Sequence, residues 1–265
     1  MESGLDHRSA RALLEWHIAL GADECIQDAP INRYALPDAA PVSVRKAAPV
    51  AEPLRAQIVP MVEVDTVAAA QRAAAAAGDL AGLRAALEGF EHCDLKRGAR
   101  NFVFADGLAG ARVMVVGEAP GREEDLEGRP FVGQAGQLLD RMLAAIGLAR
   151  DAREAERGVY ITNVLPWRPP QNRDPEAGEI AMMRPFVERH IALARPEVVI
   201  LMGNHACDAV LQRKGILRLR GQWAEAVGVP VMPMTHPAYL LRNPAAKREA
   251  WADLLAVQAR LRGGA

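Results

Sequence analysis

The chain has few of the residues that mark disulfide-rich, zinc-knuckle or membrane proteins. Its 265 residues include three cysteines, Cys25, Cys93 and Cys207, which are far apart and odd in number. They favour neither a disulfide framework nor a metal site, so we expect reduced thiols. No apolar run approaches the roughly 20 residues that span a bilayer, and the opening MESGLDHRSA does not resemble a signal peptide. We therefore expect a cytoplasmic protein without membrane contact.

A strong net charge is also missing, because 32 Lys and Arg residues oppose 33 Asp and Glu residues. This balance argues against a globally basic nucleic-acid binder. Basic residues exceed acidic ones from His205 onward, which a solvated face explains about as well as a nucleic-acid contact does. No GxxxxGK[ST] phosphate loop occurs either, which argues against a nucleotide-binding protein of unrelated chemistry.

Apolar segments alternate between strand-like and helix-like patterns, which predicts an α/β fold. We expect a central parallel four-stranded sheet flanked by helices on both faces. The expected strands span 101–104, 112–116, 159–163, 198–202 and 229–232, and the expected helices span 65–77, 80–90, 133–146, 177–194, 205–211 and 245–261. Residues 63–265 would form this domain, with its two leading helices.

An extension precedes the domain. Residues 9–20 have the apolar spacing of a short amphipathic helix. Six prolines among alanines follow between residues 28 and 60, which indicates an extended linker. We therefore assign residues 1–62 to a helical and Pro/Ala-rich N-terminal extension.

The segment GEAPGREEDLEGRPFVGQAGQLLD, residues 117–140, directly follows an expected buried strand. Ligands of open α/β sheets bind beyond the carboxyl ends of the strands, so a site is expected here. We expect a loop that carries Glu118, a Pro-Gly turn, the acids 123–125 and the aromatic Phe131. Its carboxylates would repel phosphate.

Other expected strands end in polar groups at the same edge. Asn163 follows one strand; such an Asn is often a cap, but its amide can also read the edge of a pyrimidine. Gly203 follows the next strand and would let a ligand approach the backbone. His236 lies in the loop THPAYLLRNP, either as a structural residue or as a catalytic one.

A carboxylate, an aromatic ring, an amide and a histidine at one rim suit a base flipped out of DNA. Leu240 and Leu241 could then fill the gap in the duplex while Arg242 binds phosphate. Alternatively, the two leucines begin a core helix.

Three motifs, GEAPGREEDLEGRPFVGQAGQLLD, VYITNVLPWRPPQNR and HPAYLLR, make residues 91–261 resemble a family 4 uracil-DNA glycosylase. The resemblance implies that Phe131 stacks on uracil and that Asn163 bonds its O4 and N3 edge. Gly117, Glu118 and the backbone near Ala119 would lie close to O2 and the attacking water, and His236 would stabilise the uracil anion. Asp125 is the second choice for the carboxylate that positions the water, and Asn172 would assist the water or the sugar.

The chain departs from the family at the four cysteines that usually hold a [4Fe–4S] cluster. The flanking motifs place Cys93, Lys96, Trp167 and Met183 at these positions. With one thiolate left, we expect no cluster and no other metal, and apolar packing by Trp167 and Met183. A relative that becomes trapped on DNA carries a histidine in the loop equivalent to 169–175, where this chain has none.

We therefore expect a monomeric, monofunctional glycosylase that acts on uracil-containing DNA and leaves an abasic site for repair. The alternative is a protein that binds uracil or abasic DNA with little turnover. The presence of Glu118, Asn163 and His236 favours the enzyme.

Overall fold

The computed structural model describes residues 11–12, 14–15 and 65–263. The chain divides into two compact units, Met1–Pro60 and Met61–Ala265, and the second holds the sheet and the helices α2 to α11. Residues 11–12 and 14–15 are helical. The rest of the expected N-terminal helix, the Pro-rich segment and Cys25 lie outside the described residues, and the boundary at residue 62 stays a prediction.

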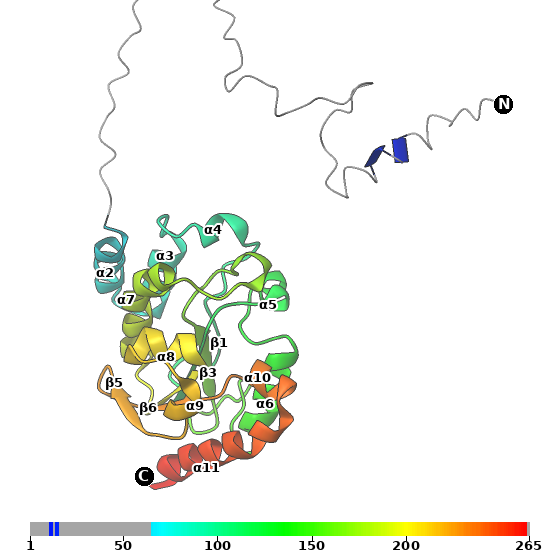
Figure 1. Ribbon diagram of the computed structural model, residues 1–265. Helices are drawn as coiled ribbons and strands as arrows, with labels where there is room; N and C mark the ends of the chain where they lie inside the picture. Colours follow the sequence, from blue (N-terminus) through cyan, green and yellow to red (C-terminus); the bar gives the residue numbers. More distant parts are fainter. Residues whose placement is uncertain (1–10, 13, 16–64, 264–265) are drawn as a thin grey trace, which may run out of the picture. The chain divides into compact units, whose positions relative to one another are not determined.

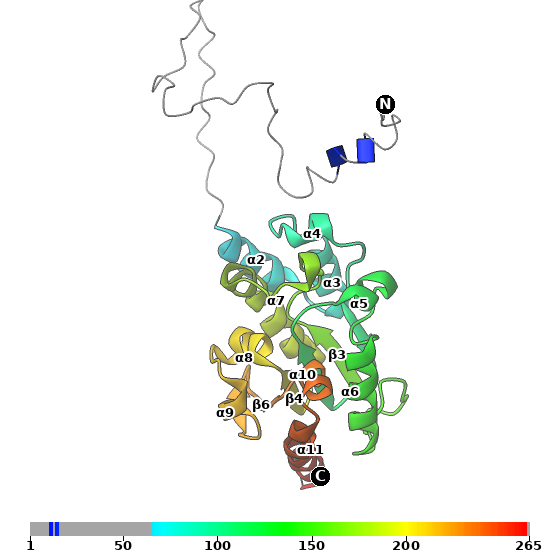
Figure 2. The same cartoon turned by 45° about the vertical axis from the view of Figure 1, so that its right-hand side comes forward.

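A six-stranded sheet with the order β1-β3-β2-β4-β6-β5 forms the centre of this unit (Figures 1 and 2). Its strands are β1 (Ala105–Gly107), β2 (Val113–Gly117), β3 (Val159–Asn163), β4 (Val198–Met202), β5 (Ala224–Ala226) and β6 (Val229–Met234). The four inner strands run parallel, as the sequence predicts, and β1 and β5 add antiparallel edges.

Two of the sequence-based strand assignments need correction at these edges. The strand expected at 101–104 begins only at Ala105, where antiparallel pairing with Thr162 starts. The β5 strand was not expected, because three residues next to a turn carry too short an alternation to be recognised.

Alternation along the inner strands separates the two faces of the sheet. Met114 and Val116 belong to one buried cluster, whereas Val113 and Val115 belong to the other. The first face packs under α7 (Ala177–Ala194) and α8 (Asn204–Leu211), and the second under α6 (Gln134–Ala144) and α11 (Lys247–Gly263). Figures 1 and 2 show α7 and α8 on one side of the sheet and α6 on the other.

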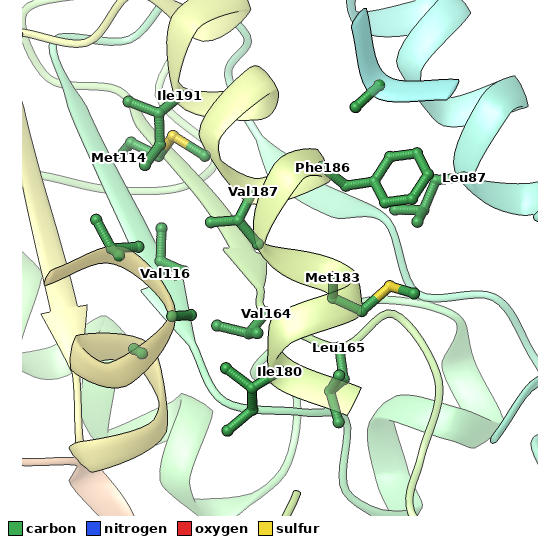
Figure 3. Close-up of a cluster of buried hydrophobic side chains, with 14 of the residues drawn as sticks. Leu87, Met114, Val116, Val164, Leu165, Ile180, Met183, Phe186, Val187 and Ile191 are labelled. Atoms are coloured by element: carbon green, nitrogen blue, oxygen red, sulfur yellow. The ribbon is translucent and has the colours of Figure 1, made fainter. Parts of the chain in front are cut away.

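The leading helices α2 (Thr66–Ala76) and α3 (Leu80–Glu88) extend the first cluster behind α7. Figure 3 shows Phe186 of α7 beside Leu87 of α3, with Met183 one turn away. The Phe186 ring also contacts Phe90 edge to face, with centroids 5.2 Å apart. Asp65 and Asp79 cap the two leading helices through their carboxylates, as their positions in the sequence predict.

Short helices occupy two segments that the sequence suggested were loops. The acidic segment contains α5 (Arg122–Glu127), and the segment after β6 contains α10 (Pro237–Arg242). Both are six residues long, which is too short for a clear 3.6-residue period. The remaining short helices are α4 (Leu95–Gly98), η2 (Pro170–Asn172), α9 (Ile216–Leu219) and η3 (Pro244–Ala246).

Parallel pairing brings the ends of the inner strands to one edge. Gly117 at the end of β2 lies opposite Asn163 at the end of β3, and Met202 of β4 lies opposite Met234 of β6. The residues that follow these four strands therefore converge on one end of the sheet. Among the described residues, we find no helix with the length and apolar character needed to cross a membrane.

Candidate functional site

A cavity of about 690 Å³ opens at this edge of the sheet. It is lined by Glu118, Ala119, Pro120, Gly121, Glu123, Glu124, Phe131, Gly133, Gln134, Ala135, Asn163, Pro169, Asn172, Arg173, Asp174, His236, Ala238, Tyr239, Leu241 and Arg242. The segments that follow β2, β3 and β6 all contribute, so the structure brings together three of the four loops singled out in the sequence. Gly203, which follows β4, is not among the lining residues.

Asn163 places an unpaired amide in the wall of the cavity. Its side chain is buried, with a residue exposure of 7%, yet neither Oδ1 nor Nδ2 has a hydrogen-bond partner among the described residues. A buried amide without partners is costly, so it is a strong indication of a polar ligand. Gly117 makes the arrangement possible, because a Cβ atom there would lie 2.4 Å from Asn163 Oδ1 and 2.5 Å from the Phe131 ring.

Phe131 holds its ring over the same space by adopting an unusual backbone conformation. Its φ of 54° lies in the left-handed region, which costs a non-glycine residue on the order of 1–3 kcal/mol. The residue is 5% exposed, and its ring stacks on His236, with centroids 5.6 Å apart and planes 28° apart. The missing Cβ of Gly136 leaves room for the Phe131 carbonyl, from which it would be only 1.8 Å away.

His236 is the N-cap of α10, and its Nδ1 accepts a hydrogen bond from the Ala238 N–H at 3.2 Å. Burial, with a smaller contribution from the Arg242 charge, lowers the pKa of His236 to about 4. The ring is therefore neutral near pH 7, with its proton on Nε2. His236 thus offers a neutral N–H donor beside the Phe131 ring.

Glu118 follows β2 directly and lines the cavity. Burial, followed by the charge of Asp174, raises the pKa of Glu118 to about 7. His205 Nε2 lies 3.8 Å from Glu118 Oε2 and 4.0 Å from Asp174 Oδ2. One ligand atom from each of these three side chains lies within 4.8 Å of the others, a spacing that could hold a metal ion.

The neighbouring acids have structural partners. Glu124 accepts hydrogen bonds from the N–H groups of Gly121, Val132 and Gly133 and so fixes the turn around the aromatic residue. Asp125 does not line the cavity, and its Oδ1 accepts from the N–H groups of Arg100 and Asn101. The geometry therefore favours Glu118 over Asp125 as the carboxylate of the site.

The expected DNA-contacting residues differ in burial. Leu240 is 1% exposed and packs with Leu138 and Ala250, as the alternative interpretation of a core helix requires. Leu241 is 38% exposed and lines the cavity together with Arg242. Of the two leucines, only Leu241 is therefore accessible to DNA.

Ala119 and Asn172 also line the cavity. Asn172 has a left-handed φ of 54°, and its Oδ1 accepts from Arg168 Nε at 2.7 Å.

The positions equivalent to cluster cysteines do not suit an iron-sulfur cluster. Cys93, Trp167 and Met183 are buried in the first core cluster. The Lys96 ammonium donates to Glu91 and to the Glu88 carbonyl and lies 6.0 Å from the Trp167 ring centre. Only Cys93 of the four offers a thiol, and burial raises the pKa of that thiol, which disfavours the thiolate that ligates iron.

His205, Asp174 and Tyr239 were not singled out from the sequence. His205 is the second residue of α8, at the same sheet edge, and its position after Gly203-Asn204 is the signal that could have revealed it. Its Nδ1 is the third buried side-chain atom without a hydrogen-bond partner in the described part of the chain, after the two of Asn163.

Comparison with known proteins identifies the family. The family model described as the uracil DNA glycosylase superfamily matches residues 104–255. The chain is 40% identical over 172 residues to a type-4 uracil-DNA glycosylase of Archaeoglobus fulgidus. The matched region covers 61% of this chain and 82% of that protein. The chain is 41% identical over 162 residues to the type-4 enzyme of Sulfurisphaera tokodaii, with 57% and 71% covered. A type-5 uracil-DNA glycosylase of Pyrobaculum aerophilum is 35% identical over 149 residues, with 52% and 66% covered. The chain therefore belongs to the uracil DNA glycosylase superfamily and resembles its type-4 members.

Proposed function

We propose that the protein removes uracil from DNA by hydrolysing the N-glycosidic bond, which leaves an abasic site for repair. The observation that carries this proposal is the unpaired Asn163 amide in the cavity wall, next to the Phe131 ring. One donor and one acceptor in a plane match the N3–H and O4 edge of uracil, whereas the N3 and amino edge of cytosine has the opposite pattern. The base must leave the DNA stack to reach this amide.

Phe131 supports the flipped base from one side. Its ring is rigidly placed and nearly buried, so it offers a flat apolar surface without loss of side-chain freedom on binding. Gly117 keeps the space between this ring and Asn163 free of a side chain.

His236 stabilises the leaving group in this proposal. When the C1′–N1 bond breaks, its electron pair passes to uracil, and negative charge develops on O2. A neutral imidazole with its proton on Nε2 can donate a hydrogen bond to O2 and keep that proton. Such a donor acts mainly in the transition state, where it typically contributes about 3 kcal/mol.

Glu118 acts on the attacking water. In its ionised form it accepts a proton from water as the oxygen bonds to C1′, and its charge also stabilises the cationic sugar. Glu118 gains one proton from the water, and the uracil anion takes up one proton on release, so the number of protons balances. The raised pKa of Glu118, about 7, suits a base that works near neutral pH.

The exposed residues at the cavity rim suit a DNA strand. Leu241 can occupy the space of the extruded base, while Arg242 and Arg173 lie at the cavity where phosphates would pass. Leu240 has no part in this contact, because it belongs to the core.

Cleavage of an end-labelled oligonucleotide with a single uracil, followed by alkaline scission of the abasic product, tests the proposal. We expect multiple turnovers with the wild type and none on the same oligonucleotide with thymine. His236→Ala should lower the single-turnover rate about 100-fold with little effect on binding, and Asn163→Ala should abolish most uracil cleavage. His92→Ala, on an exposed residue outside the cavity lining, is the matched control and should cleave at the wild-type rate.

Tight binding of uracil DNA without cleavage would instead support a binding protein. Wild-type rates in both the Asn163 and the His236 variants would contradict the site assignment, even if the protein is a glycosylase.

A further inference from the structure

Arg150 lies outside the cavity lining but is bonded to the segment that carries Phe131. Its side chain is 14% exposed, and its guanidinium donates to four oxygen atoms. Nη1 donates to the Pro130 carbonyl at 2.9 Å, and Nη2 donates to the Phe131 carbonyl at 2.8 Å. These two bonds meet the backbone at the residue with the left-handed φ.

The other two bonds fix the guanidinium itself. Nε donates to Asp140 of α6 at 2.8 Å, and Nη1 donates to Asp106 of β1 at 3.0 Å. The backbone next to Arg150 is also anchored, because Ala149 forms an isolated bridge with Gly158 just before β3. Arg150 therefore connects a sheet edge and a helix to the Phe131 main chain, with two carboxylates to balance its charge.

We infer that Arg150 is a positioning residue of the site: it holds the Phe131 main chain in the conformation that presents the ring to the cavity. This inference rests on the proposed function, in which the Phe131 ring stacks on the flipped base. A left-handed φ at a bulky residue persists only where its surroundings impose it. The Arg150 bonds and the missing Cβ of Gly136 act on the same carbonyl group and together impose it.

Lysine cannot replace this arrangement. The guanidinium directs its N–H groups in a fixed plane, and four of the five are used here by acceptors in different directions. An ammonium group has three N–H donors on one atom, so Arg150→Lys keeps the charge but loses part of the hold on Phe131.

A double-mutant cycle between Arg150 and Phe131 tests the inference. Arg150→Met should lower kcat/KM on a single-uracil oligonucleotide about 10- to 100-fold, because a displacement of about 1 Å is enough to impair a reaction geometry. In the Phe131→Ala background, the same substitution should cost less than about threefold, because no ring remains to be positioned. Arg150→Lys should give an intermediate loss.

Arg112→Met is the matched control, since Arg112 also bonds a carboxylate, that of Glu197, and a main-chain carbonyl, that of Leu261, away from the cavity. We expect it to cleave within about threefold of the wild type. Equal losses from Arg150→Met in both Phe131 backgrounds would overturn the inference, as would a folded Arg150→Met protein with wild-type kcat/KM.

Should Arg150→Met fail to fold, Gly136→Ala tests the same point, because its Cβ would displace the Phe131 carbonyl while the change itself favours a helix. It should reduce cleavage in the wild-type background and far less in Phe131→Ala. A folded Gly136→Ala protein with unchanged cleavage would refute the inference.

Binding gives a readout that does not depend on cleavage. An oligonucleotide with 2′-fluoro-deoxyuridine resists hydrolysis because fluorine destabilises the cationic sugar. A wild type that binds this strand more tightly than a thymine strand and yet does not cleave uracil DNA would reject the proposed function. The double-mutant cycle of Arg150 and Phe131 could then still be measured on the binding affinity. A wild type that neither cleaves nor prefers uracil would reject both.

Discussion

Glu118→Gln should stabilise the folded protein above neutral pH while it removes catalysis. Burial and the Asp174 charge raise the pKa of Glu118 to about 7, compared with the ordinary value of 4.5. At about 1.4 kcal/mol for each pH unit, this difference makes the ionised carboxylate unfavourable to folding by up to about 3 kcal/mol. Glutamine has the same shape without the charge, so it avoids this cost.

The direction of the pH dependence follows from proton binding. Between pH 4.5 and about 7, the folded chain keeps the Glu118 proton that the unfolded chain has lost. The folded state binds more protons there, so the Glu118 contribution to stability falls as pH rises through this window. We therefore expect the two proteins to be equally stable near pH 4, to diverge between pH 4.5 and 7, and to differ by a constant amount above pH 7.

Urea unfolding at pH 5, 6, 7 and 8, with linear extrapolation to water, measures this difference. Glu88→Gln, at an exposed position on α3, is the control for loss of a carboxylate at the surface. A constant difference between wild type and Glu118→Gln across this range, or a variant that is less stable at pH 8, would refute the reasoning.

The same titration should control the reaction. If Glu118 works as an ionised base, single-turnover cleavage rises about tenfold per pH unit below pH 7 and levels off above it. His236 does not contribute to this rise, because its pKa of about 4 keeps it neutral throughout. Glu118→Gln should be slow and independent of pH; retention of the wild-type profile would exclude Glu118 as the titrating group.

Three further predictions concern the cavity wall, the leucine pair of α10 and the iron content of the protein. Gly117→Ala should fold but lose at least 100-fold in uracil cleavage, because its Cβ would meet Asn163 at 2.4 Å and Phe131 at 2.5 Å; cleavage within threefold of wild type would refute this. Leu240→Ala should cost about 2–5 kcal/mol in urea unfolding, whereas Leu241→Ala should cost less than about 1 kcal/mol and instead weaken DNA cleavage; the reverse pattern would contradict the assignment. The purified protein should contain no iron and show no absorbance near 400 nm; a brown sample with bound iron would contradict the expectation based on the cysteines.

The parallel core was predictable because the apolar pattern and the length of each inner segment both indicate a strand. Strands β2, β3 and β4 are buried along their whole length at the expected positions, and β2 and β4 appear as continuous apolar runs. The convergence of Glu118, Asn163 and His236 follows from that topology, since each residue lies at the end of a parallel strand or within two residues after it. Short edge strands and six-residue helices carry little periodicity, so β5, α5 and α10 could not be predicted from it.

The partners of each polar side chain could not be predicted from position alone. Glu118 and Asp125 are seven residues apart in one acidic segment, and their positions rank Glu118 first and Asp125 second as the carboxylate at the water without excluding either. Only folding shows that Asp125 faces the N–H groups of Arg100 and Asn101, which come from a distant part of the chain. His205 was overlooked for the same reason, because its proximity to Glu118 arises between strands and not along the sequence.

Three local features that oppose folding lie at one place in the described domain. The Phe131 backbone has a left-handed φ, the Asn163 amide is buried without partners, and the Glu118 carboxyl is held at a raised pKa. Each of these features opposes folding, and each borders the same cavity. A ligand that donates and accepts hydrogen bonds at Asn163 and develops positive charge near Glu118 would relieve the second and third features, and the first places a ring on which that ligand can stack. The clustering therefore supports a binding and reaction site at this edge of the sheet on physical grounds that are independent of sequence similarity.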